Sequence, residues 1–408
     1  MWPPVNAPGH SLRAWGAALL GLALFACGDA GRDAAGPGAG GGAAAGAAEV
    51  DALLEALPAP GGEGRFLAGS IFDTVEESFP IELILSGGVP KDGIPALTDP
   101  PFADADAAPA YLRDDDLVLG LAINGEAKAY PHNIGWRHEI VNDRVGGHPV
   151  AVTFCPLTGT GLAFDARDGA GGRFELGVSG LLINTNLIMY DRRDGRSLYP
   201  QMTFTGVRGP RKGEDLRLLP LTETTWGTWK ALYPETRVVA VGAEDPAPYL
   251  RYPYGEYRTD DGLLLFPLEI PLADNPNPWA TAYPAKSGML GLRFAGESKA
   301  YPFAALGERA AVNDRVGGVE VAVLWDRGAR IAVPLVRRVG GRVLEFDVDS
   351  GAGFPFGLRD RQTGTRWNFK GEAVEGPLAG ERLLQAPGHS AFWFAWLTFW
   401  PQTGVWEP

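Results

Sequence analysis

The chain has 408 residues, with 49 Asp and Glu against 36 Lys and Arg, so its formal net charge is −13. This acidic balance argues against nucleic acid, or an anionic lipid surface, as a partner. Because the whole chain contains two cysteines, a scaffold built on many disulfides is excluded. The length leaves room for two domains of ordinary size.

The N-terminus has the features of an export signal. Arg13 precedes an apolar run over residues 14–26, which is too short to span a bilayer but long enough for a signal peptide. The run ends in Leu-Phe-Ala-Cys, which resembles the bacterial lipobox, where the cysteine is lipidated. We therefore expect a lipoprotein signal peptide at 1–26 and a lipid on Cys27. The alternative is an ordinary signal peptide that carries a cysteine by chance.

The residue after Cys27 bears on the location of the mature protein. It is Gly28, rather than the Asp that commonly retains lipoproteins at the inner membrane. We therefore expect an exported protein anchored at the outer membrane, on its periplasmic side or at the cell surface. Contact with the membrane is expected only through the lipid anchor.

Composition and an internal repeat divide the rest of the chain. Residues 27–49 contain little but Gly and Ala after the cysteine, which is typical of a flexible tether. GLAINGEAKAYP at 120–131 returns as GLRFAGESKAYP at 291–302, an offset of 171 (291 minus 120), and VNDRVGG at 141–147 returns unchanged at 312–318. We predict two related domains or one pseudo-symmetric pair. The expected segments are a lead-in at 50–109, repeat 1 at 110–245, a connector at 246–280 and repeat 2 at 281–408.

The predicted fold class is mainly β (α+β), with one helix packed on each repeat. Short runs of β-branched and aromatic residues are separated by Gly, Pro and Asp, which is typical of strands joined by tight turns. Thr224 or Thr225 can cap a helix, and Ser390 precedes its counterpart in the second repeat. The tryptophans of these helices are expected in the core, with ligand stacking as the alternative. They are Trp226, Trp229, Trp393, Trp396 and Trp400.

A β-hairpin is predicted over residues 140–154. The runs 140–145 and 149–154 are rich in strand-forming residues, and Gly146-Gly147 tolerates the positive φ angles of a primed hairpin turn. In that register Val145 pairs with His148. A four-residue loop is the alternative, and it keeps the same faces together.

Continuing the pairing places a thiol beside an imidazole at the open end of this hairpin. Cys155 falls opposite His138 with the two-residue turn, or opposite Trp136 with the longer loop, which leaves His138 as a diagonal neighbour on the same face. Glu139 follows His138 and is expected to point to the other face. The second repeat gives an internal comparison, because the offset of 171 turns Cys155 into Asp326 and His138 into Arg309. We expect an ion pair there and a purely structural second repeat.

These residues suggest thiol chemistry. His138 can pair with a thiolate at Cys155 or act as a general base, and backbone N–H groups of the following loop can lower the thiol pKa. Thr158 and Thr160 are expected to polarise the site as further catalytic residues. The open alternative is a buried, inert cysteine packed as a small hydrophobic residue.

Metal binding is the competing prediction. Cys155, His138 and His132 would form a soft site suited to copper, whereas His148 lies too far away at the hairpin tip. No Cys-x-x-Cys or His-x-x-x-His spacing supports zinc, so the main prediction includes no cofactor. Polar residues elsewhere are assigned to substrate binding, although Asx-turn chemistry explains some of them equally well. The substrate-binding candidates are Lys91, Trp136, Asn184, Asn186 and Gln201.

Several motifs resemble a family of exported proteins, the domain-of-unknown-function family numbered 3179. They include KDGIP at Lys91, HEIVND at His138 and CPLTGT at Cys155, and the matching pieces cover essentially the whole mature chain. Members often carry a second Cys where this chain has Thr158, and some are named as selenoproteins. The resemblance therefore implies a redox role for the motif, although Thr158 rules out a Cys-x-x-Cys disulfide here. The family supplies no established reaction.

Three functions follow as hypotheses. The first is an exported thiol oxidoreductase in which Cys155 cycles between thiolate and sulfenate or a mixed disulfide, with an unknown redox partner. The second is a periplasmic copper-binding or delivery protein. The third is a non-catalytic envelope module whose Trp-rich faces engage a partner or glycan.

Overall fold

The computed structural model describes residues 83–169, 171–351 and 353–408. The expected signal peptide, Cys27, the Gly/Ala tether and the lead-in as far as residue 82 lie outside the described residues. Strands dominate the described chain, so the predicted mainly β class is correct. No helix in these described ranges combines the length and apolar character that a membrane crossing requires.

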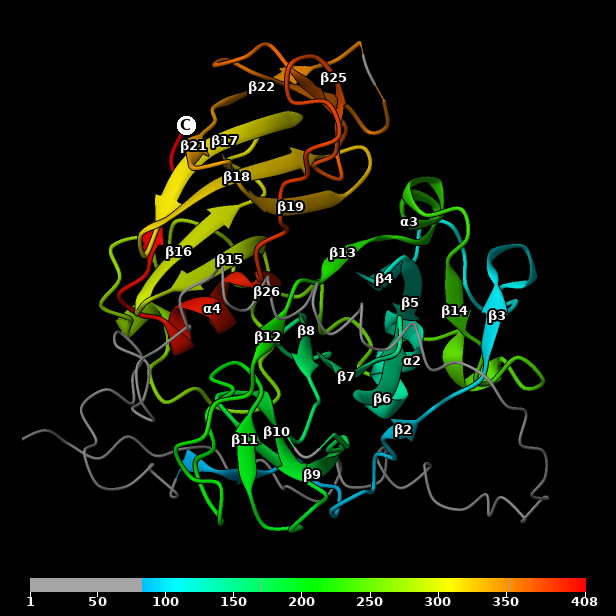
Figure 1. Ribbon diagram of the computed structural model, residues 1–408. Coiled ribbons are helices and arrows are strands. Elements are labelled where there is room, and N and C mark those ends of the chain that lie inside the picture. The colour runs from blue at the N-terminus through cyan, green and yellow to red at the C-terminus, as the bar shows by residue number, and fades with distance from the viewer. Residues whose placement is uncertain (1–82, 170, 352) are drawn as a thin grey trace, which may run out of the picture. The chain divides into compact units, whose positions relative to one another are not determined.

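The first half of the described chain forms three sheets (Figure 1). Each sheet is centred on an antiparallel pair of neighbouring strands, and short strands, some from far along the chain, add at the edges. The first sheet has the order β13 (Thr222–Thr225), β4 (Leu117–Ile123), β5 (Glu126–Pro131), β14 (Arg237–Val239) and β3 (Phe102–Asp104). The second has β12 (Leu218–Leu219), β8 (Thr160–Asp165), β7 (His148–Cys155), β6 (Ile140–Val145) and β2 (Leu97–Thr98). The third has β1 (Leu85–Ser86), β9 (Leu176–Ile183), β10 (Asn186–Asp191) and β11 (Leu198–Pro200).

The second half repeats this arrangement with fewer edge strands. Adding 171 to the bounds of β4, β5, β7 and β8 gives the bounds of β15 (Gly288–Phe294), β16 (Glu297–Pro302), β18 (Val319–Asp326) and β19 (Ile331–Val336). One sheet joins β26 (His389–Phe392), β15, β16 and β27 (Gly404–Val405), and another joins β17 (Arg309–Val316), β18 and β19. The remaining strands are β22 (Phe346–Asp349), β23 (Gly357–Asp360), β24 (Arg366–Trp367) and β25 (Ala373–Glu375) in one sheet, and the pair β20 (Arg338–Val339) and β21 (Arg342–Val343). The 3-10 helices of the described ranges are η3 (Ala105–Ala107), η4 (Ala247–Tyr249) and η5 (Leu272–Asp274).

The sequence shared by the two halves builds the same polar brace twice. Lys128 lies 3.0 Å from an Asp143 carboxylate oxygen, and the Tyr130 hydroxyl donates to the same carboxylate at 2.7 Å. In the second half Asp314 receives Lys299 at 2.7 Å and the Tyr301 hydroxyl at 2.9 Å. The lysine and tyrosine of the KAYP motif therefore hold the aspartate of the VNDRVGG motif. This brace ties two sheets together, which explains why both motifs persist in both halves.

A second shared element links the hairpin to the third sheet of each half. The Asn142 side chain accepts from the Leu176 N–H at 2.9 Å and donates to the Leu176 carbonyl at 3.0 Å. Asn313 makes the same pair of bonds to Phe346, at 2.8 and 2.9 Å. The two amides satisfy backbone groups at the start of β9 and β22. Because the same bonds occur in both halves, Asn142 and Asn313 have a structural role and are not part of a site found in one half only.

Helices α3 (Trp226–Leu232) and α4 (Trp393–Phe399) are the two helices expected from the sequence. Thr225 caps α3, since its hydroxyl accepts from the Thr228 N–H, whereas Phe392 occupies the N-cap of α4 without a side-chain bond. All five tryptophans named for these helices are at most 1% exposed. They are core residues, as expected, so they do not form a Trp-rich face for a partner or glycan.

A third helix, α2 (His132–His138), departs from the expectation of one helix per repeat. It has no counterpart in the second half, where β17 already begins at Arg309. Gly135 allows α2 to approach β7, because a Cβ there would lie 2.8 Å from a ring carbon of Phe154. Tertiary packing, and not a capping side chain, therefore fixes this helix.

The two halves exchange contacts in a reciprocal way. The Phe392 N–H, at the start of α4, donates to the Thr158 carbonyl of the first half at 2.9 Å. The hydroxyls of Thr224 and Thr228, at the start of α3, donate to the Ala329 carbonyl of the second half at 3.0 and 2.9 Å. Ala329 is the residue that corresponds to Thr158 at the offset of 171. Each half therefore closes a loop of the other with its own helix.

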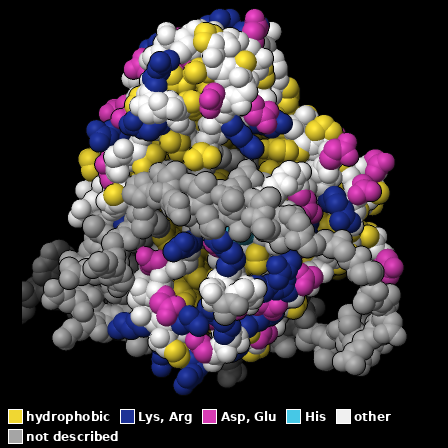
Figure 2. Space-filling view, in the orientation of Figure 1, with side chains coloured by type: hydrophobic (Ala, Val, Ile, Leu, Met, Phe, Trp, Pro, Cys, Tyr) yellow, Lys and Arg dark blue, Asp and Glu magenta, His cyan; other side chains and the backbone are white. Residues whose placement is uncertain are grey.

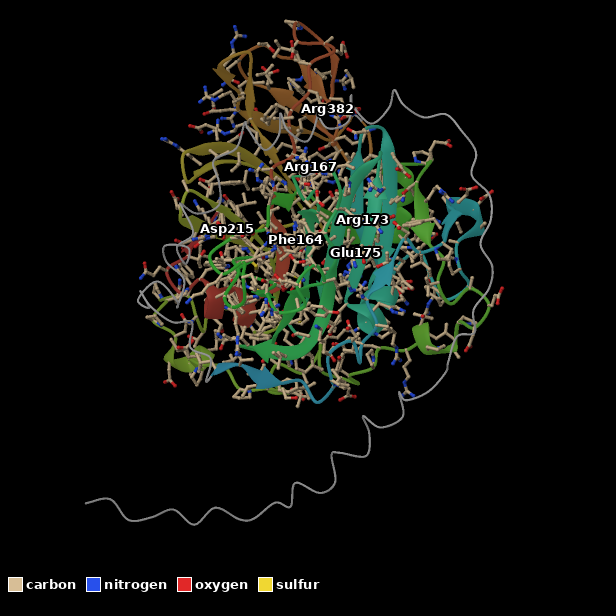
Figure 3. All side chains as sticks on the ribbon, turned by 60° about the horizontal axis from the view of Figure 1, so that its bottom comes forward. Phe164, Arg167, Arg173, Glu175, Asp215 and Arg382 are labelled. Carbon is tan, nitrogen blue, oxygen red and sulfur yellow. The ribbon has the colours of Figure 1, made fainter. Side chains whose placement is uncertain are left out.

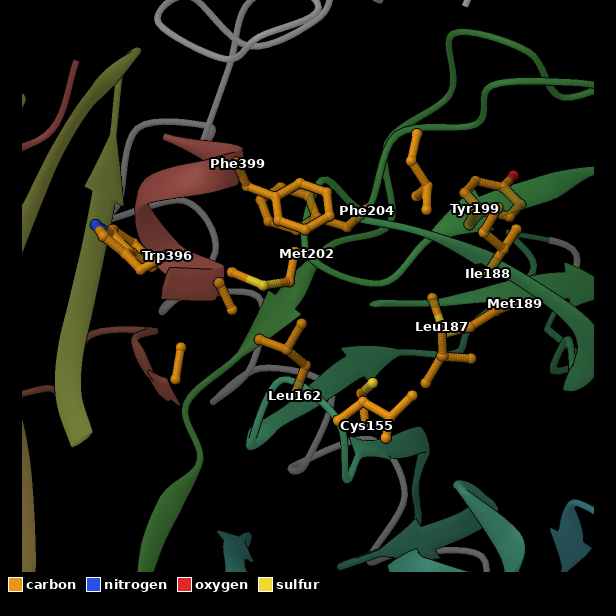
Figure 4. Packing of buried hydrophobic residues seen from close by; sticks show 14 of the residues in the cluster. Cys155, Leu162, Leu187, Ile188, Met189, Tyr199, Met202, Phe204, Trp396 and Phe399 are labelled. Carbon is orange, nitrogen blue, oxygen red and sulfur yellow. The ribbon is translucent and has the colours of Figure 1, made fainter. Parts of the chain in front are cut away.

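One apolar core crosses between the halves at the end of β7. Figure 4 shows Trp396 and Phe399 of α4 beside Met202 and Phe204 of the first half. Cys155 belongs to the same core, close to Leu187 (Figure 4). The thiol thus lies where the two halves meet, and both halves determine its surroundings.

Candidate functional site

Cys155 is the last residue of β7 and pairs with Thr160, the first residue of β8. The loop between them contains Gly159, which has φ +60 and packs so closely on Phe392 that a Cβ would meet its ring at 2.9 Å. The Cys155 side chain is free of any disulfide and 1% exposed, and its Sγ donates to the Thr185 carbonyl at 3.7 Å. The site is therefore a buried thiol at the start of the short loop that joins β7 to β8.

The predicted hairpin register is confirmed, but the expected partner of the thiol is wrong. Val145 pairs with His148 and Ile140 with Thr153, as the two-residue turn requires. However, His138 is the last residue of α2 and not a strand residue. Its Nδ1 bonds to the Pro95 carbonyl at 2.8 Å and its Nε2 to the Tyr249 hydroxyl at 3.0 Å.

Because both ring nitrogens of His138 are engaged, the imidazole does not serve the thiol in this arrangement. Burial also lowers the pKa of His138, against a smaller raising effect of its bond to Pro95. The imidazole is therefore held neutral, and the expected ion pair with a Cys155 thiolate is replaced by structural hydrogen bonds.

Glu139, and not His138, is the neighbour of α2 whose charge acts on the thiol. It follows α2 with φ 55, a positive value that L residues rarely adopt, while its carbonyl accepts from the Phe154 N–H at 2.7 Å. In a regular strand its side chain would face away from Cys155, as we expected. The positive φ breaks that alternation, and the negative charge of Glu139 is one of the influences on the Cys155 thiol.

The Glu139 carboxyl is a buried acid without a recorded partner. The residue is 7% exposed, and among the described residues the structure records no hydrogen bond or ion pair from its side chain. Burial raises the pKa of this carboxyl to about 8. Glu139 is therefore mainly protonated at neutral pH and can exchange a proton close to physiological pH.

The thiol pKa is raised, in contrast to the lowered value expected from the sequence. Burial is the main cause, and the negative charge of Glu139 adds to it. Hydrogen bonds from the side chain and backbone of Thr158 and from the Leu187 backbone act in the opposite direction. The loop thus supplies the expected stabilisation of a thiolate, but desolvation outweighs it.

Four of the predicted polar residues form a continuous network beside the thiol. Thr158 Oγ1 accepts from Thr160 Oγ1 and from Asn186 Nδ2, each at 3.0 Å. Asn186 Nδ2 also donates to Gln201 Oε1 at 2.9 Å, and Gln201 Nε2 donates to Thr153 Oγ1 at 2.9 Å and to the Thr160 carbonyl at 3.1 Å. All five side chains are at most 1% exposed. A buried polar network of this size is costly unless every member is satisfied, so it orders the site tightly.

The other substrate-binding candidates have different surroundings. Asn184 lies in the β9–β10 turn with Thr185, and its Oδ1 accepts from the Glu269 N–H at 2.7 Å, which is a structural role. Lys91 is exposed, donates to the Gly195 carbonyl at 3.0 Å and lies over the Tyr190 ring. These contacts hold a surface loop and do not bring Lys91 to the thiol.

The connector between the repeats covers the site, which sequence reasoning missed. Tyr252 donates to the Pro156 carbonyl at 3.2 Å and Tyr257 to the Leu157 carbonyl at 2.9 Å. Burial raises the pKa of Tyr254, and the charges of Glu139 and Cys155 add to it. Trp136 packs on Tyr252 with ring centroids 5.3 Å apart, and so reaches only the rim of the site. The density of tyrosine in YLRYPYGEY at 249–257 was the available signal.

The second half lacks this chemistry. Arg309 and Asp326 form the expected ion pair at 2.7 Å, in directly opposed strand positions. At the same offset Thr153, Thr158 and Thr160 correspond to Leu324, Ala329 and Ile331, which belong to an apolar core. The fold therefore does not need the polar network, which accompanies Cys155 alone.

The three residues of the copper alternative do not share a site. The His132 ring stacks on Phe154 with centroids 4.1 Å apart and its Nε2 lies 3.5 Å from Glu223, while His138 is engaged as described above. Within the described ranges, no group of three or more His, Cys, Asp or Glu side chains is placed to hold a metal ion. Copper binding thus gains no support from these residues.

Comparison with known proteins gives one match. The family model described as "Protein of unknown function (DUF3179)" matches residues 91–403, which span every described element that lines the thiol site. No curated protein and no solved structure matches the chain.

Proposed function

We propose that this chain, which belongs to the DUF3179 family of proteins of unknown function, is an exported lipoprotein with thiol-dependent redox activity at Cys155. The observation that carries the proposal is a buried thiol, Cys155, whose pKa is raised in part by the charge of a second buried acid, Glu139. The thiol lies beside a polar network that the second half replaces with apolar residues. Glu139, and not His138, is the proton-transfer group in this proposal.

Oxidation begins with attack of the Cys155 sulfur on the O–O bond of a small peroxide. A sulfur–oxygen bond forms, the O–O bond breaks, and two electrons leave the sulfur with the departing oxygen. The thiol proton passes to the Glu139 carboxylate and from there to the leaving oxygen, which departs as water or an alcohol. The product at Cys155 is a sulfenic acid, for which Thr158 offers a hydrogen bond.

Reduction requires an external thiol. A low-molecular-weight thiol condenses with the sulfenic acid, which releases water and forms a mixed disulfide. A second such thiol attacks the mixed disulfide and regenerates Cys155, with its proton returned. The chain has Thr158 where a resolving cysteine would close an internal disulfide, so the reducing partner comes from outside.

The burial of the site limits the oxidant to a small molecule. Cys155 is 1% exposed and lies under the tyrosines of the connector. A disulfide in a protein cannot approach such a sulfur without displacing Tyr252 or Tyr257, whereas hydrogen peroxide can. The proposal therefore favours small peroxides over protein disulfides as oxidants.

The test compares peroxide oxidation of Cys155 with the thiol pKa, both measured against pH. The wild-type rate is expected to rise through an inflection near pH 8, the pKa of Glu139. In Glu139→Gln the thiol pKa falls because a like charge is lost, yet the rate per thiolate falls about tenfold because no carboxylic acid remains to give a proton to the leaving oxygen. His138→Gln is the matched control and keeps the inflection.

Two results would refute the proposal. If the wild-type thiol is not oxidised by millimolar peroxide while the chain stays folded, Cys155 is a buried, unreactive cysteine. A Glu139→Gln rate that simply follows the thiolate fraction would remove Glu139 from the proton transfer. Lipidation is tested separately by mass spectrometry of the mature N-terminus, with Cys27→Ser as the variant that loses the anchor.

A further inference from the structure

A large polar cavity lies at the opposite end of β7 from the thiol. It measures about 800 Å³ and opens between the β6–β7 turn, the residues that follow β8, and the loop at 208–217. Because β7 runs from His148 to Cys155, the two sites are separated by about 23 Å of strand. The cavity is therefore distinct from the thiol site, and an inference about it does not rest on the proposed redox function.

Basic side chains of one kind gather in this cavity. Five arginines line it, from four separate segments, and no lysine does. Arginine presents a planar set of donors that matches carboxylate and phosphate oxygens, so this composition favours oxyanions over a diffuse attraction. Four carboxylates line the same cavity, so the five arginines leave a formal charge of +1 (5 minus 4); the carboxylates are Asp165, Asp168, Glu214 and Asp215. The arginines are Arg144, Arg167, Arg193, Arg211 and Arg217.

Three of these arginines are already held by carboxylates. Arg167 makes a bidentate contact with Asp165, at 2.7 Å for its closest pair of atoms. Arg193 and Arg211 both reach Asp191, which is fully buried behind the cavity. These ion pairs fix the guanidinium groups in place before any ligand arrives. Such preorganisation lowers the entropy cost of binding.

The other two arginines form no salt bridge within the described chain, although the charge of Arg144 contributes to the lowered pKa of Asp99. Arg144 donates to the Gly147 carbonyl of its own turn at 3.3 Å, and Arg217 is exposed with only its backbone engaged. Figure 3 labels Arg167 and Asp215, which come from two of the segments around the cavity, and Figure 2 shows Lys and Arg side chains on the lobe that carries β9 to β11. Arg144 and Arg217 are thus the charges that a ligand would neutralise.

A buried His–Asp pair completes one wall of the cavity. His148 Nε2 lies 3.0 Å from Asp165 Oδ1, and both residues are nearly inaccessible. Burial alone would raise the pKa of Asp165, but the bonds from His148 and Arg167 hold it below its usual value. The equivalent positions of the second half are Val319 and Val336, so the strands fold without this pair.

We propose that this cavity binds a small organic anion that carries phosphate or carboxylate groups. Arg144 and Arg217 contact the anionic groups, and the pair of His148 and Asp165 orients Arg167 beside them. A volume of about 800 Å³ falls within the range of small-molecule sites in proteins. The arginines line a cavity and do not form a flat surface, which favours a metabolite-sized ligand over a macromolecule.

The experiment measures binding to the full chain by isothermal titration calorimetry. Inorganic phosphate and pyrophosphate test the phosphate class, citrate tests the carboxylate class, and glycerol is the neutral control. At least one anion is expected to bind saturably, and more weakly at about 0.5 M than at about 0.05 M NaCl. Arg144→Gln and Arg217→Gln are each expected to weaken that binding about tenfold.

Matched variants come from the second half of the chain. Arg315 corresponds to Arg144 in the repeated VNDRVGG motif but lies outside the cavity, so Arg315→Gln is expected to bind like the wild type. The double change His148→Val and Asp165→Val installs the residues that the second half uses, and it is expected to weaken binding while the chain stays folded. Absence of saturable binding by all three anions would overturn the proposal. Equal losses in Arg144→Gln and Arg315→Gln would do the same.

Discussion

At Glu139, a positive φ angle separates the end of α2 from the start of β6. The residue ends α2 with φ 55, so the strand alternation that should continue from β6 is interrupted one residue before β6 begins. The carboxyl is buried, and the structure records no hydrogen bond or ion pair for it among the described residues. Strain of this kind persists where the surroundings fix the backbone, and it is common at functional sites.

The burial of Glu139 gives a stability prediction with a definite sign. The carboxyl pKa rises from 4.5 in the unfolded chain to about 8 in the folded protein, so the folded state holds the proton more tightly. Its contribution is fully present below pH 4.5 and is lost as the pH rises towards 8. From about pH 5 to about pH 8, Glu139→Gln is expected to gain roughly 3 kcal/mol relative to the wild type.

Urea unfolding of both proteins at the two pH values measures this difference. Other titrating groups are shared by the two proteins and cancel in the comparison. A difference that stays constant with pH would show that Glu139 is already ionised in the folded chain. That outcome would also weaken its assignment as a proton acceptor for Cys155.

Part of the site could be predicted from the residues and part could not. Cys155, Thr158, Thr160, Asn186 and Gln201 were found because thiol, hydroxyl and amide groups were unusual among apolar neighbours, and the structure brings them together. Glu139 was dismissed because strand alternation was extended too far. A positive φ at a glutamate leaves no trace in the sequence, since glutamate has no preference for that conformation.

Between elements, the brace of lysine, tyrosine and aspartate is the feature that both halves share. In the first half the side chains of Lys128 and Asp143 are 9% and 5% exposed, whereas those of Lys299 and Asp314 are 23% and 18% exposed. Removing one partner of a buried pair leaves an uncompensated charge, and the penalty grows with burial. The two copies therefore allow the stability contribution of the same ion pair to be compared at two degrees of burial.

Replacement of the aspartate should cost more in the first half than in the second. We expect Asp143→Asn to lower the free energy of unfolding by about 3 kcal/mol, because Lys128 is left buried with only the longer carboxylate contact to Glu126, at 3.7 Å. For Asp314→Asn we expect about 1 kcal/mol, because water reaches Lys299. Chemical denaturation of the two variants provides the comparison. Equal losses would contradict a role for burial in setting the strength of the brace.

The elements differed in how far the sequence could predict them. The hairpin register followed from the Gly146-Gly147 turn, and α3 followed from a threonine cap and a tryptophan face. Helix α2 could not be predicted, because it has seven residues, no side-chain cap and a glycine at position 135. Contact between Gly135 and Phe154 stabilises it, and such a contact exists only after the sheets have formed.

Across the whole molecule, the reciprocal contacts make the two halves depend on each other. The Thr158 carbonyl accepts from Phe392, the Ala329 carbonyl accepts from Thr224 and Thr228, and a single core extends from Cys155 to Trp396. Neither half can open at this core without exposing apolar surface of the other. The domain boundaries proposed from the sequence stay a prediction, and the contacts suggest that the halves unfold together.

We therefore expect one cooperative unfolding transition. Tryptophan fluorescence and alkylation of Cys155 should report the same midpoint. Cys155 lies in the first half of the chain, whereas three of the five helix tryptophans lie in the second half, so the two probes report on different halves. Trp396→Ala should lower both midpoints together and reduce the free energy of unfolding by about 3 to 5 kcal/mol, because it empties a fully buried position. Two separated transitions, with alkylation preceding the loss of fluorescence, would contradict the shared core.

The close fit of Phe392 on Gly159 makes the proposed activity of Cys155 depend on the second half of the chain. Phe392 belongs to the second half, which has no thiol, yet it packs against the loop that follows Cys155. The second repeat is therefore needed for the structure of the thiol site. In a genetic screen for loss of peroxide-dependent phenotypes, substitutions at Phe392 or Trp396 should be recovered alongside those at Cys155. Deletion of the second repeat should abolish the trait rather than halve it.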